Sequence, residues 1–125
     1  MMENPLAVRA FLSVEAAAFV GASLIHRGIL VEGLRHQQAG TAEAVIAVAL
    51  LLGLALTWAP PPWALRAAIA AQAFALLGVL VGLFTIAIGV GPRTAPDLAY
   101  HAAILVVLAV GLVVMWRRRA VTTAS

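Results

Sequence analysis

The sequence contains neither cysteine nor lysine, and it has few charged residues of any kind. Without cysteine the chain has no disulfides, thiolate metal ligands or iron–sulfur clusters, so a bound metal would need histidine and carboxylate ligands. Charged residues make up 10% of the 125 residues, against roughly 25% in an ordinary soluble domain. This shortage of charge excludes a water-soluble globular protein.

Hydrophobic residues make up 64% of the chain, and the mean hydropathy is +1.06. A disordered chain is far less hydrophobic, so the composition indicates a protein that lies in a bilayer. The net charge is +3, but no basic face with interleaved aromatic residues is present to bind nucleic acid. Because the apolar residues are spread over several segments, residues 1–125 are expected to form a single integral membrane domain.

Four apolar segments are long enough, or nearly so, to cross a membrane as helices. A hydrocarbon core of about 30 Å needs about 20 apolar residues in a helix. The predicted fold is therefore an all-α membrane protein, a four-transmembrane-helix bundle with short connections. The predicted spans cover residues 6–25, 41–58, 63–88 and 98–116. We expect the first to be a permanent helix and not a signal peptide, because Glu15 interrupts its apolar region.

Proline, glycine and capping residues mark the boundaries of these spans. Prolines 60–62 cannot continue a helix, so the second and third spans are expected to form a tight hairpin. Thr94 and Asp97 have the spacing of a helix cap, which predicts the start of the fourth span. Gly40 is expected to open the second span. The apolar residues in the connection 26–40 predict a helical extension of the first span or an interfacial segment.

The arginines predict the orientation of the bundle. An even number of spans places both termini on one side of the membrane, and positively charged residues favour the cytoplasmic side. The terminal side carries Arg9, Arg66 and 117–119, and the other side carries Arg27, Arg35 and Arg93. The three tryptophans fall on the terminal side, at the depth that an indole prefers. We therefore expect cytoplasmic N and C termini, in a membrane of the bacterial inner-membrane type.

Glu15 lies near the midpoint of the first span, about 13 Å from its inner end at about 1.5 Å per residue. A charge at this depth is unfavourable, so the side chain should face the bundle and have a partner or a proton. Gln72 of the third span lies at nearly the same depth, which predicts a hydrogen bond between the two. Glu15 would then either bind a proton or cation in exchange for a ligand, or fix helix register as a hydrogen-bonded acid.

A second polar group is predicted at the outer end of the bundle, where all three histidines should meet. If the local chain is helical, Glu32 and His36 share one helix face, as do Asp97 and His101. Thr85 should reach the same level. The predicted site residues at this end are His26, His36, Glu43, Asp97, Tyr100 and His101.

The outer-end residues suit more than one role. They could bind zinc, copper or iron, orient a haem or quinone, or relay protons toward Glu15. They could equally form a polar vestibule without a metal, with pairs such as Arg93–Asp97 and Glu32–Arg35 stabilising the helix ends. No spacing among them has the specificity of a known metal-binding motif.

Gly78 and Gly82 form a small-xxx-small pattern in the third span. Such residues let membrane helices approach closely. The pattern predicts packing within the bundle, with a homo-oligomer seam as the alternative. Because four helices enclose little space, transport would require an oligomer.

The layout resembles that of the small multidrug resistance exporters. The resemblance rests on four short spans, an early glutamate and the turn formed by Gly91-Pro92-Arg93 and Pro96-Asp97. In that family the glutamate binds protons and cationic drugs in turn, so the resemblance implies the same role for Glu15. The histidine-rich first connection departs from the family pattern.

Three functions are compatible with these features. The first is a membrane-embedded binding or transport module that uses Glu15 and the outer-end residues. The second is a metal- or haem-dependent redox component of a membrane enzyme. The third is a non-catalytic subunit that packs against a larger membrane complex. Hydrolytic catalysis is not expected, because Ser13 and Ser23 have no base beside them in the sequence.

Overall fold

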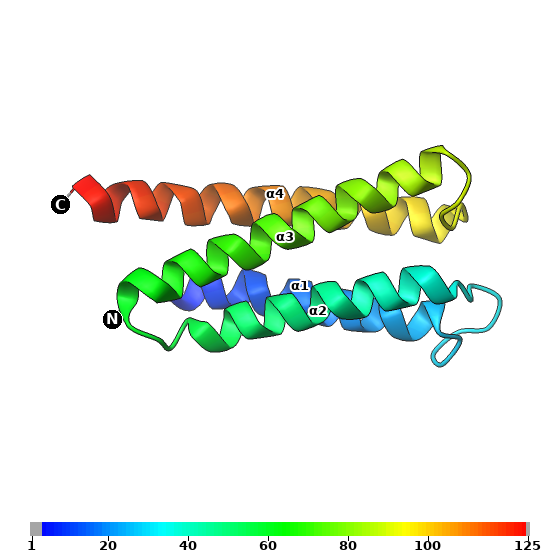
Figure 1. Ribbon diagram of the computed structural model, residues 1–125, viewed down its shortest axis with the longest axis horizontal. Coiled ribbons are helices and arrows are strands. Elements are labelled where there is room, and N and C mark those ends of the chain that lie inside the picture. The colour runs from blue at the N-terminus through cyan, green and yellow to red at the C-terminus, as the bar shows by residue number, and fades with distance from the viewer. Residues whose placement is uncertain (1–3, 125) are drawn as a thin grey trace.

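The computed structural model describes residues 4–124, which fold into four helices running alternately up and down. They are α1 (Leu6–His26), α2 (Gln37–Leu56), α3 (Pro61–Ala87) and α4 (Ala95–Ala124). Both ends of the chain and the α2–α3 connection lie at one end of the bundle, called the terminal end (Figure 1). The α1–α2 and α3–α4 connections lie at the opposite end, called the connection end.

All four helices are long and apolar enough to span a membrane. Large apolar side chains are exposed along each of them, for example Val14 on α1, Leu52 on α2, Phe84 on α3 and Val106 on α4. A soluble monomer rarely exposes apolar surface of this extent. The fold is thus that of a four-helix bundle compatible with an integral membrane protein.

Close packing between neighbouring helices depends on small residues. A Cβ atom at Gly53 of α2 would lie 2.5 Å from Cβ of Ala71 on α3, and one at Gly78 would lie 2.6 Å from Cδ1 of Ile46 on α2. A Cβ atom at Gly82 would lie 3.0 Å from Nε2 of His101 on α4. Gly78 and Gly82 therefore pack α3 against α2 and α4 of the same chain, as the first interpretation of the pattern predicts.

The structure excludes one of the two predicted forms of the first connection, the helical extension of the first span. Residues 27–36 are turns, bends and irregular chain, so the expectation of a helical extension is wrong. Gly28 and Gly33 have φ angles of 75° and 86°, left-handed values that a continuing α-helix does not contain. Because residue 32 does not lie in a helix, the predicted i,i+4 relation between Glu32 and His36 is absent, and Glu32 is exposed.

Several helix ends also differ from the predicted spans. The second helix begins at Gln37, before Gly40, because Nδ1 of His36 accepts a hydrogen bond from the Ala39 amide and caps it. Gly40 lies inside α2, where its carbonyl accepts a 2.7 Å hydrogen bond from the Ser23 hydroxyl. The fourth helix continues through the three arginines to Ala124.

The predicted cap of the fourth helix is confirmed. The Asp97 amide donates to Oγ1 of Thr94, and the Thr94 amide donates to Oδ2 of Asp97, which is the reciprocal pattern of a capping box. The predicted Arg93–Asp97 pair is wrong, because the Arg93 guanidinium donates to the carbonyls of Ile86 and Ala87 instead. Carbonyls at a helix C-terminus lack helical partners, so this contact completes the end of α3.

The terminal end contains cation–π contacts between arginine and tryptophan. The Arg9 guanidinium lies 3.9 Å from the ring centroid of Trp58 and donates a 3.0 Å hydrogen bond to Oγ1 of Thr57. Arg119 lies 5.1 Å from the centroid of the exposed Trp116 ring. Arginines and indoles thus gather at the terminal end and join α1 to the end of α2.

Candidate functional site

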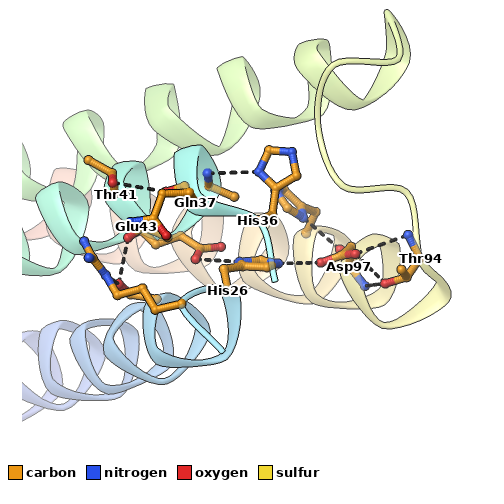
Figure 2. A network of polar contacts seen from close by, with 12 residues as sticks. His26, His36, Gln37, Thr41, Glu43, Thr94 and Asp97 are labelled. Carbon is orange, nitrogen blue, oxygen red and sulfur yellow. Dashed lines mark hydrogen bonds and ion pairs between the residues drawn. The ribbon is translucent and has the colours of Figure 1, made fainter. Parts of the chain in front are cut away.

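At the connection end, one imidazole joins three helices. His26 closes α1, Nδ1 of its ring lies 2.7 Å from Oε2 of Glu43 on α2, and Nε2 lies 2.8 Å from Oδ1 of Asp97 on α4. All three side chains are buried. Figure 2 shows the ring of His26 lying between the two carboxylates. We call this arrangement the His26 bridge.

The two contacts of His26 restrict where its protons lie. A carboxylate only accepts hydrogen bonds, and a neutral imidazole has one N–H. The ring can therefore donate to both carboxylates only as an imidazolium, and otherwise one carboxyl group must carry the proton. In either form the three side chains share a proton among them, and removing any of them would leave a buried charge or polar group unpaired.

His101 and Tyr100 lie one turn further along α4, beside the bridge. Nδ1 of His101 donates a 2.7 Å hydrogen bond to the backbone carbonyl of Asp97. The Tyr100 ring packs edge-on against Phe19 and against His101, with ring centroids 6.1 Å and 5.5 Å apart. The Tyr100 hydroxyl is buried and has no hydrogen-bond partner. An unpaired buried hydroxyl is unfavourable, so it marks a place where a bound molecule could supply the missing contact.

His36 lies at the edge of this group. Its Nε2 is 3.2 Å from the carbonyl of Val90 in the α3–α4 connection, and its ring centroid is 6.4 Å from that of His26. Because Nδ1 accepts from the Ala39 amide, Nε2 is the protonated nitrogen and donates to Val90. The structure thus brings together all six predicted outer-end residues, with His36 serving mainly to cap α2 and to join the two connections.

Two cavities lie on either side of these residues. The first, of about 160 Å³, lies between α2, α3 and α4, and we call it the α2–α3 cavity. Its polar lining includes His36, Glu43, Thr85, Tyr100 and His101. The second, of about 300 Å³, lies between α1 and α4. Small residues of α1 line it, together with His26, Asp97 and Tyr100. Glu43 of the His26 bridge thus lines the first cavity, His26 and Asp97 line the second, and Tyr100 borders both.

Glu15 and Gln72 meet in the middle of the bundle, as their depths in the sequence predict. Nε2 of Gln72 donates to Oε2 of Glu15, and neither residue is exposed. The other carboxyl oxygen of Glu15, Oε1, and the carboxamide oxygen of Gln72, Oε1, are buried without a partner. Neither residue lines the two cavities described above. The pair thus joins α1 to α3 in a closed environment.

Gly111 is a residue of this region that the sequence reading missed. A Cβ atom at this position of α4 would lie 3.0 Å from Oε1 of Glu15 and 3.1 Å from Nε2 of Gln72. The backbone of α4 therefore covers the pair directly. The signal available in the sequence was a lone glycine in the fourth span, but the sequence does not tell which way a helix faces.

Within residues 4–124, no three histidine or acidic side chains are arranged so that they could hold a metal ion. The nitrogens of His26 face carboxylates, and Nδ1 of His101 faces a backbone carbonyl. These residues form a hydrogen-bonded network and are not grouped as a set of metal ligands.

No protein-family model, curated protein or solved structure matches the chain. The function is therefore inferred from the contacts, charges and cavities of the chain itself.

Proposed function

We propose that this protein is a small membrane-embedded binding module whose ligand site is the α2–α3 cavity. The observation that supports this most is the position of a buried, proton-sharing bridge beside a cavity that also contains an unpaired tyrosine hydroxyl. Ligand sites in proteins are mostly apolar cavities with a few convergent polar groups and ionisable residues. The α2–α3 cavity fits this description.

In this proposal the connection end faces outward and the termini face the cytoplasm. The arginine-rich terminal end would then lie on the side that positively charged residues favour. The ligand would enter from the outer leaflet or the outer solution. Transport would add a second step, the passage of the ligand past the Glu15–Gln72 pair that Gly111 now covers.

The proposal is tested by ligand-induced stabilisation of the protein in lipid nanodiscs. A ligand that binds only the folded state raises the unfolding temperature. We would screen three ring compounds of similar size, cyclohexylammonium, cyclohexanol and cyclohexanecarboxylate. Ala42 is exposed and borders the cavity, so Ala42→Phe should fill it and abolish the stabilisation.

The matched control is Ala55→Phe, an exposed alanine further along α2 that does not line the cavity. It should respond to the ligand as the wild type does. If none of the three compounds raises the unfolding temperature, or if the rise survives in Ala42→Phe, the cavity is not a ligand site. Constant co-purification with one larger membrane protein, with no response to small molecules, would indicate the structural-subunit alternative.

A further inference from the structure

Three hydrogen-bond donors that line the α2–α3 cavity are already used within the protein. Nδ1 of His101 donates to the Asp97 carbonyl at 2.7 Å, and the Thr85 hydroxyl donates to the Gly82 carbonyl at 2.7 Å. Nε2 of His36 donates to Val90 at 3.2 Å. A hydroxyl and a neutral imidazole each carry a single donated proton. Oγ1 of Thr85 and Nε2 of a neutral His101 ring are therefore left as acceptors.

The net charge of the groups at this cavity is negative. Like the free acceptors, it favours a ligand that is positively charged and donates hydrogen bonds. Glu43 lines the cavity, and it shares His26 with Asp97. Two ionised carboxylates and one imidazolium sum to a charge of −1. Two arginines at this end are directed elsewhere, since Arg27 donates to Oγ of Ser23 and Arg93 donates to the end of α3. No arginine is among the residues lining the cavity, within the part of the chain that the structure describes.

The remaining walls of the cavity fit a small apolar group. Phe19, Ile46 and Val79 contribute to its lining, and its volume is about 160 Å³. Tyr100 adds one hydroxyl that is free to donate or accept, and Gln38 adds an exposed carboxamide. A ligand with several hydrogen-bond acceptors, such as a carboxylate or a quinone, would thus find few donors here.

We infer that the ligand of the α2–α3 cavity is a small primary ammonium ion that carries an apolar group. This inference rests on the binding site proposed above and names its ligand class. The ammonium supplies three N–H donors and a positive charge, which match the carboxylate of Glu43 and the acceptors left by His101 and Thr85. The apolar group lies against Phe19 and Ile46, away from water.

The test compares the three ring compounds in their binding affinity for the protein in nanodiscs, measured by isothermal titration. We expect cyclohexylammonium to bind at least about 10-fold more tightly than cyclohexanol or cyclohexanecarboxylate, because each lost ionic contact is worth about a factor of ten or more. The trimethylated ammonium keeps the charge but has no N–H group. It should bind more weakly than the primary ammonium.

Two variants show whether the named groups recognise the ammonium. Glu43→Gln removes the carboxylate charge and should remove the preference for cyclohexylammonium over cyclohexanol. Its matched control is Glu32→Gln, an exposed glutamate in the first connection, which should leave affinity unchanged. Because Glu43→Gln also weakens the His26 bridge, Thr85→Val provides a second test. It removes one acceptor outside the bridge and should lower ammonium affinity while the α-helical circular dichroism stays unchanged.

The outcomes separate the ligand class from the binding function. If cyclohexanol or cyclohexanecarboxylate binds as tightly as cyclohexylammonium, and Ala42→Phe still blocks it, the cavity is a ligand site but the ammonium inference is overturned. If the ammonium preference persists in both Glu43→Gln and Thr85→Val, the inference is also wrong. If none of the compounds binds, both this inference and the proposed function fail.

Discussion

Two buried polar regions of the described residues, the Glu15–Gln72 pair and the His26 bridge, differ both in depth and in how closely they are enclosed. The Glu15–Gln72 pair lies mid-bundle between α1 and α3, is covered by Gly111 and borders neither described cavity. The His26 bridge lies at the connection end, joins α1, α2 and α4, and has a cavity on each side. The deeper carboxylate is thus the less accessible one.

This difference shows that burial of an ionisable group does not by itself identify a ligand site. Glu15 has a neutral partner, and a single protonated carboxyl group would leave no charge in that region. The His26 bridge contains three ionisable groups and cannot be made neutral without placing a proton on a carboxyl group. A site that handles charged ligands is therefore better supported at the bridge than at Glu15. Four substitutions test this comparison.

The largest expected effect is that of His26→Ala. It leaves Glu43 and Asp97 buried without their shared partner, and breaking a buried charged contact in this way costs about 3–5 kcal/mol. The free energy of unfolding in detergent, followed by circular dichroism, measures the loss. His36→Ala is the matched control and should cost about 1 kcal/mol, since it removes a helix cap. Equal losses in the two variants would mean that the bridge contributes nothing beyond a cap.

Gly111→Leu is expected to have the next largest effect. Any side chain at this position must displace Glu15 or Gln72, and overpacking of this kind costs about 1–3 kcal/mol. Gly21→Leu is the control, because a Cβ atom there would have no neighbour within 4 Å. The same unfolding measurement applies. A stable Gly111→Leu variant would show that the mid-bundle pair is open and not sealed by α4.

Gln72→Leu should have a smaller effect. It removes the donor to Glu15 but keeps the volume of the side chain, and hydrogen bonds between membrane helices are worth about 1–2 kcal/mol or less. Ala73→Leu is the control. Ala73 is the next residue of α3, is apolar and is exposed, so this substitution should change the unfolding free energy little. A loss from Gln72→Leu as large as that from His26→Ala would contradict the view that Glu15 is easily kept neutral.

Tyr100→Phe is expected to change stability least, by about 0.5 kcal/mol or less, because its hydroxyl has no partner to lose. Its effect should appear in ligand binding instead, as a lower affinity for cyclohexylammonium. Thr41→Val, which removes an exposed hydroxyl of α2 outside the cavity lining, should leave both quantities unchanged. A large loss of stability in Tyr100→Phe would indicate that the hydroxyl supports the fold and is not reserved for a ligand.

Much of this arrangement could be predicted from the sequence because membrane helices are nearly straight. Counting residues along them gives depth, and depth alone was enough to pair Glu15 with Gln72 and to gather the histidines at one end. It could not give the rotation of each helix about its axis, so the contact of Gly111 with the pair was missed. Rotation also decides which nitrogen of His26 meets which carboxylate.

The wrong predictions concern places where backbone conformation and local hydrogen bonds override the hydrophobic pattern. The apolar residues after His26 suggested a helix, but Gly28 has a positive φ just after the end of α1, and Gly33 has another within the connection. Arg93 has the spacing to pair with Asp97, yet the unpaired carbonyls at the end of α3 bind its guanidinium and Thr94 binds the carboxylate. Both outcomes depend on the conformation of short connections, which hydropathy does not describe.

The order of the residues along the chain has a consequence for biosynthesis. Glu15, His26 and Glu43 are translated before Gln72 and Asp97, and chains fold from the N-terminus as they emerge. In a nascent α1–α2 hairpin, His26 can already contact Glu43, whereas Glu15 lacks its amide until α3 is inserted. In a bilayer, the first hairpin would therefore carry a mid-bundle carboxyl group that a proton from the solution can neutralise.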